Sequence, residues 1–548
     1  MSGKSDTIGS MTVRLLRADK TVEDTMRAGS GFREEPSEIG RMFVGQNGGG
    51  APQWVKFLNT AAGPTAKIDL QSQSCGAAWF IKVVRPSKSV RILVLTFGTG
   101  HLALEPECIE RSFGLKVVLN TVARSQLRTL DVASLDATVI QRRTQASRDI
   151  DINELGMDRY RDLLRLAAGT PSDVALARTL SGRDSLTLNR QYTITEIQPL
   201  CAKLLTLSEG VEYETDYKFI DNVKPVRDKS LIATLDGLAF AELKGMVSGQ
   251  ASDLHLSIPD IIDPSCSLDV TYVGAKLKSG NKQVFPGVDI DDYVEELKSG
   301  KFSKLAQEYW RATHAIKFVE TGSSDHKKQH KVRDCIVWEA VHNLVTYVLF
   351  GGEWFAIDKK FYVEIDKDFR RLIPSKSIVA STKATNEQHL LTELNERLDL
   401  LLMDKTQSNP SGAPTASIEF CDFFSLDRQL IHLKDGHAST SISHLWSQGV
   451  VSSESFLRDE GFRRAALKNV RKRQKETVKA GFDALLPTPA KRPTTSDFTV
   501  VYGIMRVPYK KTKKLDLPFF SKVSLRAAAQ RLEDMGFNVE VQLIEMIA

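Results

Sequence analysis

Acidic, imidazole and ammonium side chains gather in one short stretch, residues 417–449. Glu419 and Asp422 lie in an apolar run that is typical of a strand, and His432 and Lys434 lie in the next such run. Because side chains two residues apart on a strand share a face, we expect His432 and Lys434 to point the same way. The layout, an acid on one strand, a lysine on the next and then a helix, predicts a metal-dependent phosphodiesterase core.

Phosphodiester hydrolysis needs a metal ion near the scissile phosphate and a cation near the attacking water. Nucleases of the restriction-endonuclease type supply two acids and a lysine two residues beyond the second acid. We therefore expect Asp422, Glu419 and His432 to bind Mg²⁺ or Mn²⁺, and Lys434 to orient or activate water. His432 stands where an acid is usual, and Mg²⁺ prefers oxygen ligands. Strict alternation places Glu419 opposite Asp422, so both can serve only if the strand is bulged.

The residues after Lys434 predict a helix that opens with a Ser/Thr-rich cap. Ser439, Thr440 and Ser441 could cradle a phosphate at the start of this helix. Gln448 shares a helix face with His444 and could contact substrate or metal-bound water. The alternative is a hairpin whose polar side chains are structural, with His432 and Lys434 facing solvent.

A concentrated block of positive charge follows this stretch. The chain has a formal net charge of +6, but residues 463–514 contain fifteen Lys or Arg and three acidic residues, so the remainder of the chain is acidic. Such a block indicates a local contact with a polyanion, and each phosphate contact would add salt-sensitive affinity. The expected nucleic-acid-binding residues are Arg471, Lys472, Arg473, Lys475, Lys510, Lys511, Lys513 and Lys514.

The composition is that of a globular protein, with 42% apolar and 26% charged residues. The chain contains no run of eighteen apolar residues, so we expect no membrane span. The six cysteines are scattered and form no CxxC pair, which favours a reducing cytoplasm and argues against a zinc site.

The periodicity predicts an α/β fold with mixed sheets in four parts. Residues 11–150 are expected to form a mixed α/β domain, residues 151–250 a mainly helical region that includes a helix over 156–169, and residues 251–385 a β-rich meander. Residues 386–548 are expected to form a restriction-endonuclease-like α/β core that begins with an amphipathic helix over 386–404.

Two acids elsewhere bear on the same chemistry. Asp236 precedes Glu242-Leu243-Lys244, which matches a nuclease signature in letters, but the apolar spacing predicts a helix on which these groups would not converge. Glu339 lies among apolar residues in the middle of an expected strand. A buried acid needs a partner, so Glu339 is a candidate for an additional site carboxylate.

The chain resembles a sporadically distributed bacterial family of uncharacterised proteins, defined as a domain of unknown function and often found near defence genes. The resemblance spans nearly the whole chain and implies defence against phages or mobile elements. Because His-x-Lys belongs to the family's own pattern, the resemblance implies that His432 is not a local loss of activity. The matching features are Phe97-Gly98-x-Gly100-His101, Phe113-Gly114-Leu115, Gln145-x-Ser147-Arg148, Tyr217-x-Phe219-Ile220-Asp221, Trp354-Phe355-x-Ile357-Asp358, Glu419…Asp422…His432-Leu433-Lys434, Ser443-His444-Leu445 and Pro518-Phe519-Phe520-Ser521.

Two interpretations follow. In the first the protein is a metal-dependent nuclease of the restriction-endonuclease-like class that acts on nucleic acid, with DNA favoured over RNA, in antiviral defence. In the second it is a nucleic-acid-binding sensor or adaptor that does not cut. A protein partner from a defence operon and an oligomeric state are compatible with both.

Overall fold

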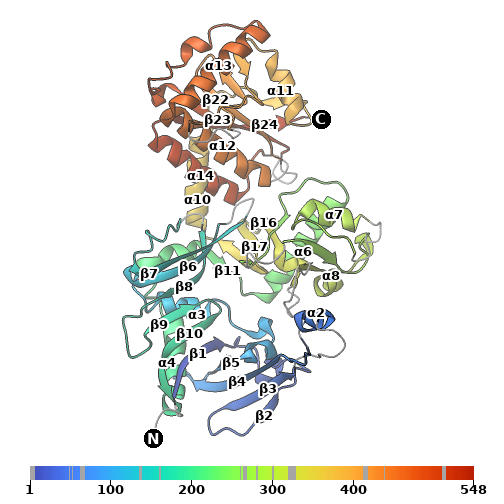
Figure 1. Ribbon diagram of the computed structural model, residues 1–548, viewed down its shortest axis with the longest axis vertical. Coiled ribbons are helices and arrows are strands. Elements are labelled where there is room, and N and C mark those ends of the chain that lie inside the picture. The colour runs from blue at the N-terminus through green and yellow to red at the C-terminus, as the bar shows by residue number, and fades with distance from the viewer. Residues whose placement is uncertain are drawn as a thin grey trace.

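The computed structural model has the mixed α/β fold that the sequence predicts, built from four sheets. Figure 1 shows the N-terminal sheet at one end of the molecule, the C-terminal sheet with its helices at the other, and the middle sheets between them. No helix in the described part of the chain is both long enough and apolar enough to cross a membrane. The structure describes residues 7–48, 50–51, 53–61, 68–134, 139–158, 162–259, 261–262, 268–278, 282–298, 302–318, 329–411, 418–436, 439–508 and 514–547.

The N-terminal sheet is antiparallel, with the order β2-β3-β4-β5-β1-β10-β9-β8-β6-β7. Alternate residues of β1, such as Met11 and Val13, are buried against α3 and α4, while Thr12 and Arg14 face the other way. The strands are β1 (Thr7–Leu15), β2 (Arg33–Glu35), β3 (Arg41–Gly48), β4 (Gln73–Val84), β5 (Val90–Gly98), β6 (Leu127–Ser134), β7 (Ile140–Ile150), β8 (Asp162–Gly169), β9 (Thr179–Gly182) and β10 (Ser185–Thr193). The helices are α1 (Val22–Thr25), α2 (Gln53–Ala61), α3 (Phe113–Leu119) and α4 (Ile197–Glu209).

The N-terminal sheet continues beyond residue 150, because β8, β9 and β10 belong to it. The helix expected over 156–169 is wrong in its second half, where β8 pairs with β6 and β9. Leucine, arginine and alanine favour helices, but pairing on both edges overrides that propensity. The helical part of 151–250 is therefore confined to α4, α5 (Glu214–Tyr217) and α6 (Lys229–Val247).

The middle of the chain forms a five-stranded and a three-stranded sheet. The expected antiparallel meander is confirmed in β16 (Ile336–His342), β17 (Val345–Phe350) and β18 (Glu353–Ile357). Residues 360–369, which belong to the expected β-rich meander, lie instead in α10 (Lys359–Arg371), where the apolar side chains at 361, 365 and 369 are buried at helical spacing. The other elements are β11 (Val223–Pro225), β12 (His255–Leu256), β13 (Val270–Val273), β14 (Ala315–Phe318), β15 (Gln329–Lys331), α7 (Ile290–Leu297), α8 (Gln307–Thr313) and α9 (Val332–Cys335).

The C-terminal sheet has the order β19-β24-β23-β22-β21-β20. β20, β21 and β22 form an antiparallel meander, and β22, β23, β24 and β19 run parallel. Apolar side chains of α11 pack on one face of this sheet, and those of α12, α13 and α14 pack on the other. The elements are β19 (Ser381–Thr382), α11 (Glu387–Asn395), β20 (Leu400–Leu402), β21 (Phe423–Ser425), β22 (Gln429–Asp435), α12 (Ser439–Arg458), α13 (Glu460–Thr477), β23 (Thr499–Arg506), α14 (Phe519–Asp534) and β24 (Asn538–Met546).

Glu339 joins the middle sheet to the C-terminal domain. Its two carboxylate oxygens accept hydrogen bonds from the backbone N–H groups of Phe519 (2.6 Å) and Phe520 (2.8 Å), at the first turn of α14. Burial raises the pKa of Glu339 to about 7, and the two N–H donors oppose that rise. Glu339 therefore caps a helix, a structural role that explains its partner.

Candidate metal centre

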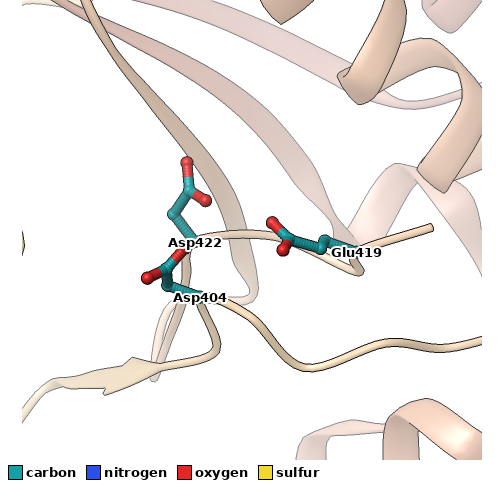
Figure 2. A group of neighbouring side chains, drawn as sticks. All are labelled: Asp404, Glu419 and Asp422. Carbon is teal, nitrogen blue, oxygen red and sulfur yellow. The ribbon is translucent and has the colours of Figure 1, made fainter. Parts of the chain in front are cut away.

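Three carboxylates converge beside the meander of the C-terminal sheet (Figure 2). Asp404 lies just after β20, and Glu419 and Asp422 lie just before β21. One oxygen from each carboxylate lies within 4.8 Å of the others, and all three residues are half-buried. Residues that are distant along the chain are thus brought within ligand distance of a single ion.

The backbone around Asp422 fixes this geometry. The N–H of Asp422 donates to the carbonyl of Ile431 (2.9 Å), and its Oδ2 accepts from the N–H of Leu433 (2.6 Å). Its own carbonyl accepts from the N–H groups of Met403 (2.7 Å) and Asp404 (3.2 Å). Asp422 is therefore tied to both neighbouring segments, near the C-terminal end of β22, and such ends of parallel strands commonly form ligand sites.

The three carboxylates of the cluster are hard to ionise together. Burial raises the pKa of Asp422 to about 7, with further contributions from the charges of Glu387, Glu419 and Asp404 and an opposing one from the Leu433 N–H. The pKa of Glu419 is also raised, first by burial and then by Asp404. Among the described residues, no Lys or Arg nitrogen lies within 4.0 Å of the Glu419 or Asp422 carboxylates. A cation would relieve this repulsion.

The donor set fits a hard divalent cation. All three groups offer carboxylate oxygen, which suits Mg²⁺ and Mn²⁺, whereas Zn²⁺ sites usually contain His or Cys. Of the five cysteines in the described part of the chain, four buried and Cys75 exposed, none contributes a ligand to the group. Asp404, Glu419 and Asp422 are thus the residues that could hold the ion.

Lys434 lies near this cluster but pairs with a different acid. Its Nζ is 2.9 Å from Oε2 of Glu387, the first residue of α11, and both side chains are about one-third exposed, at 31% and 29%. The charge of Glu387 is one cause of the raised pKa of Asp422, so Glu387 is close to the cluster. The hairpin therefore brings a lysine to the acids, through a fourth carboxylate.

Sequence reasoning missed both Glu387 and Asp404. Residues 386–404 were expected to form one amphipathic helix, whereas α11 ends at Asn395 and β20 follows. The run Leu400-Leu401-Leu402-Met403 is a signal for a short buried strand, and an acid directly after such a strand is a candidate ligand.

His432 lies apart from the three carboxylates. Its side chain is 3% exposed, its Nε2 is 3.4 Å from Ser452 Oγ on α12, and its ring is 6.2 Å from that of Tyr502. Burial lowers the pKa of His432 to about 4, which keeps the ring neutral. No group of three potential ligands within 4.8 Å in the described chain includes His432. We therefore leave it out of the metal set, because the packing of α12 on β22 holds it in the core.

The residues expected to act from the helix after Lys434 are Gln448 and those at positions 439–441. Gln448 is on α12 and its side chain is exposed, and no contact with the acidic group is recorded for it among the described residues. The segment 439–441 does open α12, as expected, but the side chains of these three residues lie outside the described part.

The basic helix α13 does border the acidic cluster. Arg473 Nη2 donates to the carbonyl of Asp404 (3.0 Å), and Asn469 Nδ2 donates to the carbonyl of Gln407 (3.0 Å). Lys472 and Lys475 are exposed on the same helix. The basic helix α13 therefore lies at the edge of the sheet where Asp404 is located.

The other residues of the basic block differ in their surroundings. Arg471 pairs with Asp483 at 3.2 Å, and Lys514 is exposed. Arg463 and Arg506 are buried: Arg463 donates to backbone carbonyls, and Arg506 pairs with Asp253. Lys510, Lys511 and Lys513 lie outside the described residues.

One comparison with known proteins gives a match. A model of a family of unknown function, DUF6119, matches residues 11–545. No curated protein and no solved structure matches the chain.

Proposed function

We propose that this chain, which belongs to the DUF6119 family of unknown function, is a metal-dependent nuclease. The observation that carries the proposal is the convergence of Asp404, Glu419 and Asp422 within 4.8 Å. The only ion pair of these three acids in the described chain joins Asp404 to Lys405 (3.6 Å), and three acids at this spacing with so little compensating charge are costly unless a cation joins them. Lys434 nearby, on the strand after Asp422, matches the layout expected for a restriction-endonuclease-like site.

The residues have distinct roles in this proposal. Asp404, Glu419 and Asp422 would hold Mg²⁺ or Mn²⁺, which supplies a polarised phosphate oxygen and a more acidic water. Lys434 Nζ, held by Glu387, would place positive charge where the phosphate gains negative charge. The exposed cations of α13 would hold the nucleic-acid backbone, independently of sequence.

A second candidate function is a nucleic-acid-binding sensor that does not cut. It is favoured by His432, which fills the position of a usual second acid but is buried beneath α12. The biological setting that we propose, cytoplasmic defence against phages or mobile elements, rests on the family resemblance and the cysteine pattern rather than on the site geometry.

The test is to incubate the full chain with duplex DNA, single-stranded DNA and RNA, with Mg²⁺, with Mn²⁺ and with chelator. We expect cleavage only with metal, and we expect Lys434→Ala to reduce its rate by about 100-fold or more, in the range of a lost electrostatic contact in a transition state. Lys383→Ala is the matched control, since Lys383 is an exposed lysine that directly follows β19 of the same sheet and has no ion pair within 4 Å among the described residues.

The two candidates give different results in this assay. Salt-sensitive binding with no cleavage of any substrate, in either metal, would reject the nuclease and support the sensor. Cleavage that is equally fast in Lys434→Ala and in the unmodified protein would reject the site as assigned, even if the chain cuts.

A further inference from the structure

A hollow of about 640 Å³ lies on the N-terminal sheet, on the face opposite α3 and α4. Its floor is formed by three neighbouring strands, β5, β1 and β10, and η1, a 3₁₀ turn over Thr99–Ala103, contributes His101 to its lining. The volume is in the range of small-molecule sites. The polar lining residues are Ser10, Thr12, Arg14, Thr96, Ser185 and Thr187, in addition to His101.

Strand register arranges hydroxyl groups across this floor. Thr12 on β1 is opposite Thr96 on β5 and Thr187 on β10, so the three side chains form a row. Thr12 Oγ1 and Thr187 Oγ1 are 3.2 Å apart. Directly opposed residues of antiparallel strands share a face, and hydroxyl groups can both donate and accept hydrogen bonds.

Arg14 lies next to this row. Its guanidinium donates to Thr96 Oγ1, and within the described chain no carboxylate lies within 4 Å of it. The acid whose charge acts on it, Asp184, is engaged by Arg111 (2.7 Å) and by the N–H of Ser112 (2.9 Å). Burial lowers the pKa of Arg14, which indicates a partly desolvated cation without a close counter-ion.

The remaining lining excludes cations as ligands and favours anions. None of the eleven described residues that line the hollow is acidic, and His101 adds a second nitrogen donor. Phe97 and Ile8 also border the hollow, but their side chains pack against the core that lies on the α3 and α4 side of the sheet. Arginine with several hydroxyl groups is a common combination for phosphate, since the guanidinium donates in a fork that matches its oxygens.

We propose that this hollow binds a phosphorylated small molecule about the size of a mononucleotide. The phosphate would contact Arg14 and the threonine row, and the rest of the molecule would lie over β5, β1 and β10. The site is separate from the acidic cluster of the C-terminal sheet, and it stands whether or not that cluster cuts nucleic acid.

Calorimetric titration of the full chain with AMP, GMP, CMP, UMP and inorganic phosphate tests the proposal, with the four matching nucleosides as the uncharged comparisons. Chelator is present throughout, so that metal at the C-terminal cluster does not contribute. We expect saturable binding of at least one monophosphate at one site per chain, about tenfold or more weaker for the matching nucleoside. Absence of saturable binding for all phosphorylated probes would overturn the proposal.

Variants locate the site. We expect Arg14→Gln to weaken binding by about tenfold or more, and Arg33→Gln, which changes an exposed arginine of the same sheet, to leave it unchanged. Thr187→Val keeps the shape of the side chain but removes one hydroxyl, so we expect it to weaken binding. Thr187→Ser keeps the hydroxyl, so we expect its affinity to be close to that of the unmodified protein. If Arg14→Gln and Thr187→Val are both folded and both bind as tightly as the unmodified protein, the assignment is overturned.

Discussion

The chain carries the pattern of an acid followed by a lysine in two regions, and the two regions use it differently. In α6, Asp236 precedes Lys244 on one 19-residue helix, as the apolar spacing predicts. In the C-terminal sheet, Asp422 precedes Lys434 across the β21–β22 hairpin. The same letters therefore lie along a single helix in one case and on adjacent segments of a sheet in the other.

The surroundings of the two acids differ as much as their backbones. Asp236 is buried and neutralised: Arg333 Nη2 (2.7 Å) and Trp354 Nε1 (2.8 Å) donate to its Oδ1, and Arg311 lies 3.0 Å from its Oδ2. Asp422 instead faces two further carboxylates and accepts one backbone N–H. An acid with two arginines serves the fold, whereas three clustered acids that share a single exposed lysine, Lys405 at 3.6 Å from Asp404, indicate a site for a cation.

The largest effect that we expect is from Asp236→Ala. This change leaves Arg333 and the Trp354 N–H buried without their partner, so we expect the free energy of unfolding to fall by about 3–5 kcal/mol. Urea denaturation of the full chain measures it. Glu242→Ala is the control on the same helix, because Glu242 has no ion pair within 4 Å among the described residues. A loss in Asp236→Ala no larger than in the control would contradict the contrast.

A smaller effect of opposite sign is expected from Asp422→Asn. The pKa of Asp422 is about 7 in the folded chain and about 3.9 when unfolded. Between these values the folded state binds more protons, so its stability falls as the pH rises from about 4 to about 7 and stays reduced above that. Asparagine removes the charge, so at alkaline pH with chelator we expect a gain of about 1–2 kcal/mol, less than the shift alone implies because solvent screens a half-buried group.

Added Mg²⁺ or Mn²⁺ should reverse the order of the two proteins. The unmodified chain gains stability by binding the ion in the folded state, and Asp422→Asn loses most of that gain. Melting curves over a range of pH, with and without metal, measure both effects. Asp131→Asn is the matched control, because Asp131 is buried but paired with Arg143 (2.6 Å), and it should lose stability. If Asp422→Asn destabilises the metal-free chain as well, the acids do not repel one another as we infer.

Local pattern was enough to predict part of the site. Apolar runs predicted β21 and β22, and the Ser/Thr cap predicted α12, although Glu419 and Asp422, expected within the first strand, lie just before β21. The short apolar run before Asp404 marks it as a candidate ligand, but its place beside Asp422 depends on long-range backbone hydrogen bonds from residues 403–404 to Asp422, which local pattern does not reveal. Glu387 is brought in by the packing of α11 on the sheet, which is also a long-range contact.

Strand alternation also could not predict how His432 and Lys434 differ. Both were expected on one face, yet His432 is held under α12 while Lys434 pairs with Glu387 of α11. A lysine has a flexible four-carbon stem that can reach past the end of a strand, and an imidazole has none. The helix α10 was missed for a different reason. Its aromatic and β-branched residues favour a strand, but Asp358 caps the helix and the spacing of the apolar residues 361, 365 and 369 is helical.

The smallest effect concerns the two lysines of α13 that face solvent. Of the four basic residues expected here, Arg471 and Arg473 make contacts within the protein. Within the described residues, the one ion pair of Lys472 is to Glu476 at 3.7 Å, and Lys475 is exposed. If α13 holds a phosphate backbone, changing Lys472 and Lys475 to Gln should weaken binding and lower the slope of log affinity against log salt by roughly 1.5. Anisotropy with labelled duplex and single-stranded DNA in chelator measures this slope.

The matched control is the pair Lys82→Gln and Lys88→Gln, which removes the same charge from exposed lysines of the N-terminal sheet. An equal loss in both pairs would mean that net charge alone drives binding, and that the position of α13 beside Asp404 gives the C-terminal region no advantage over the N-terminal one.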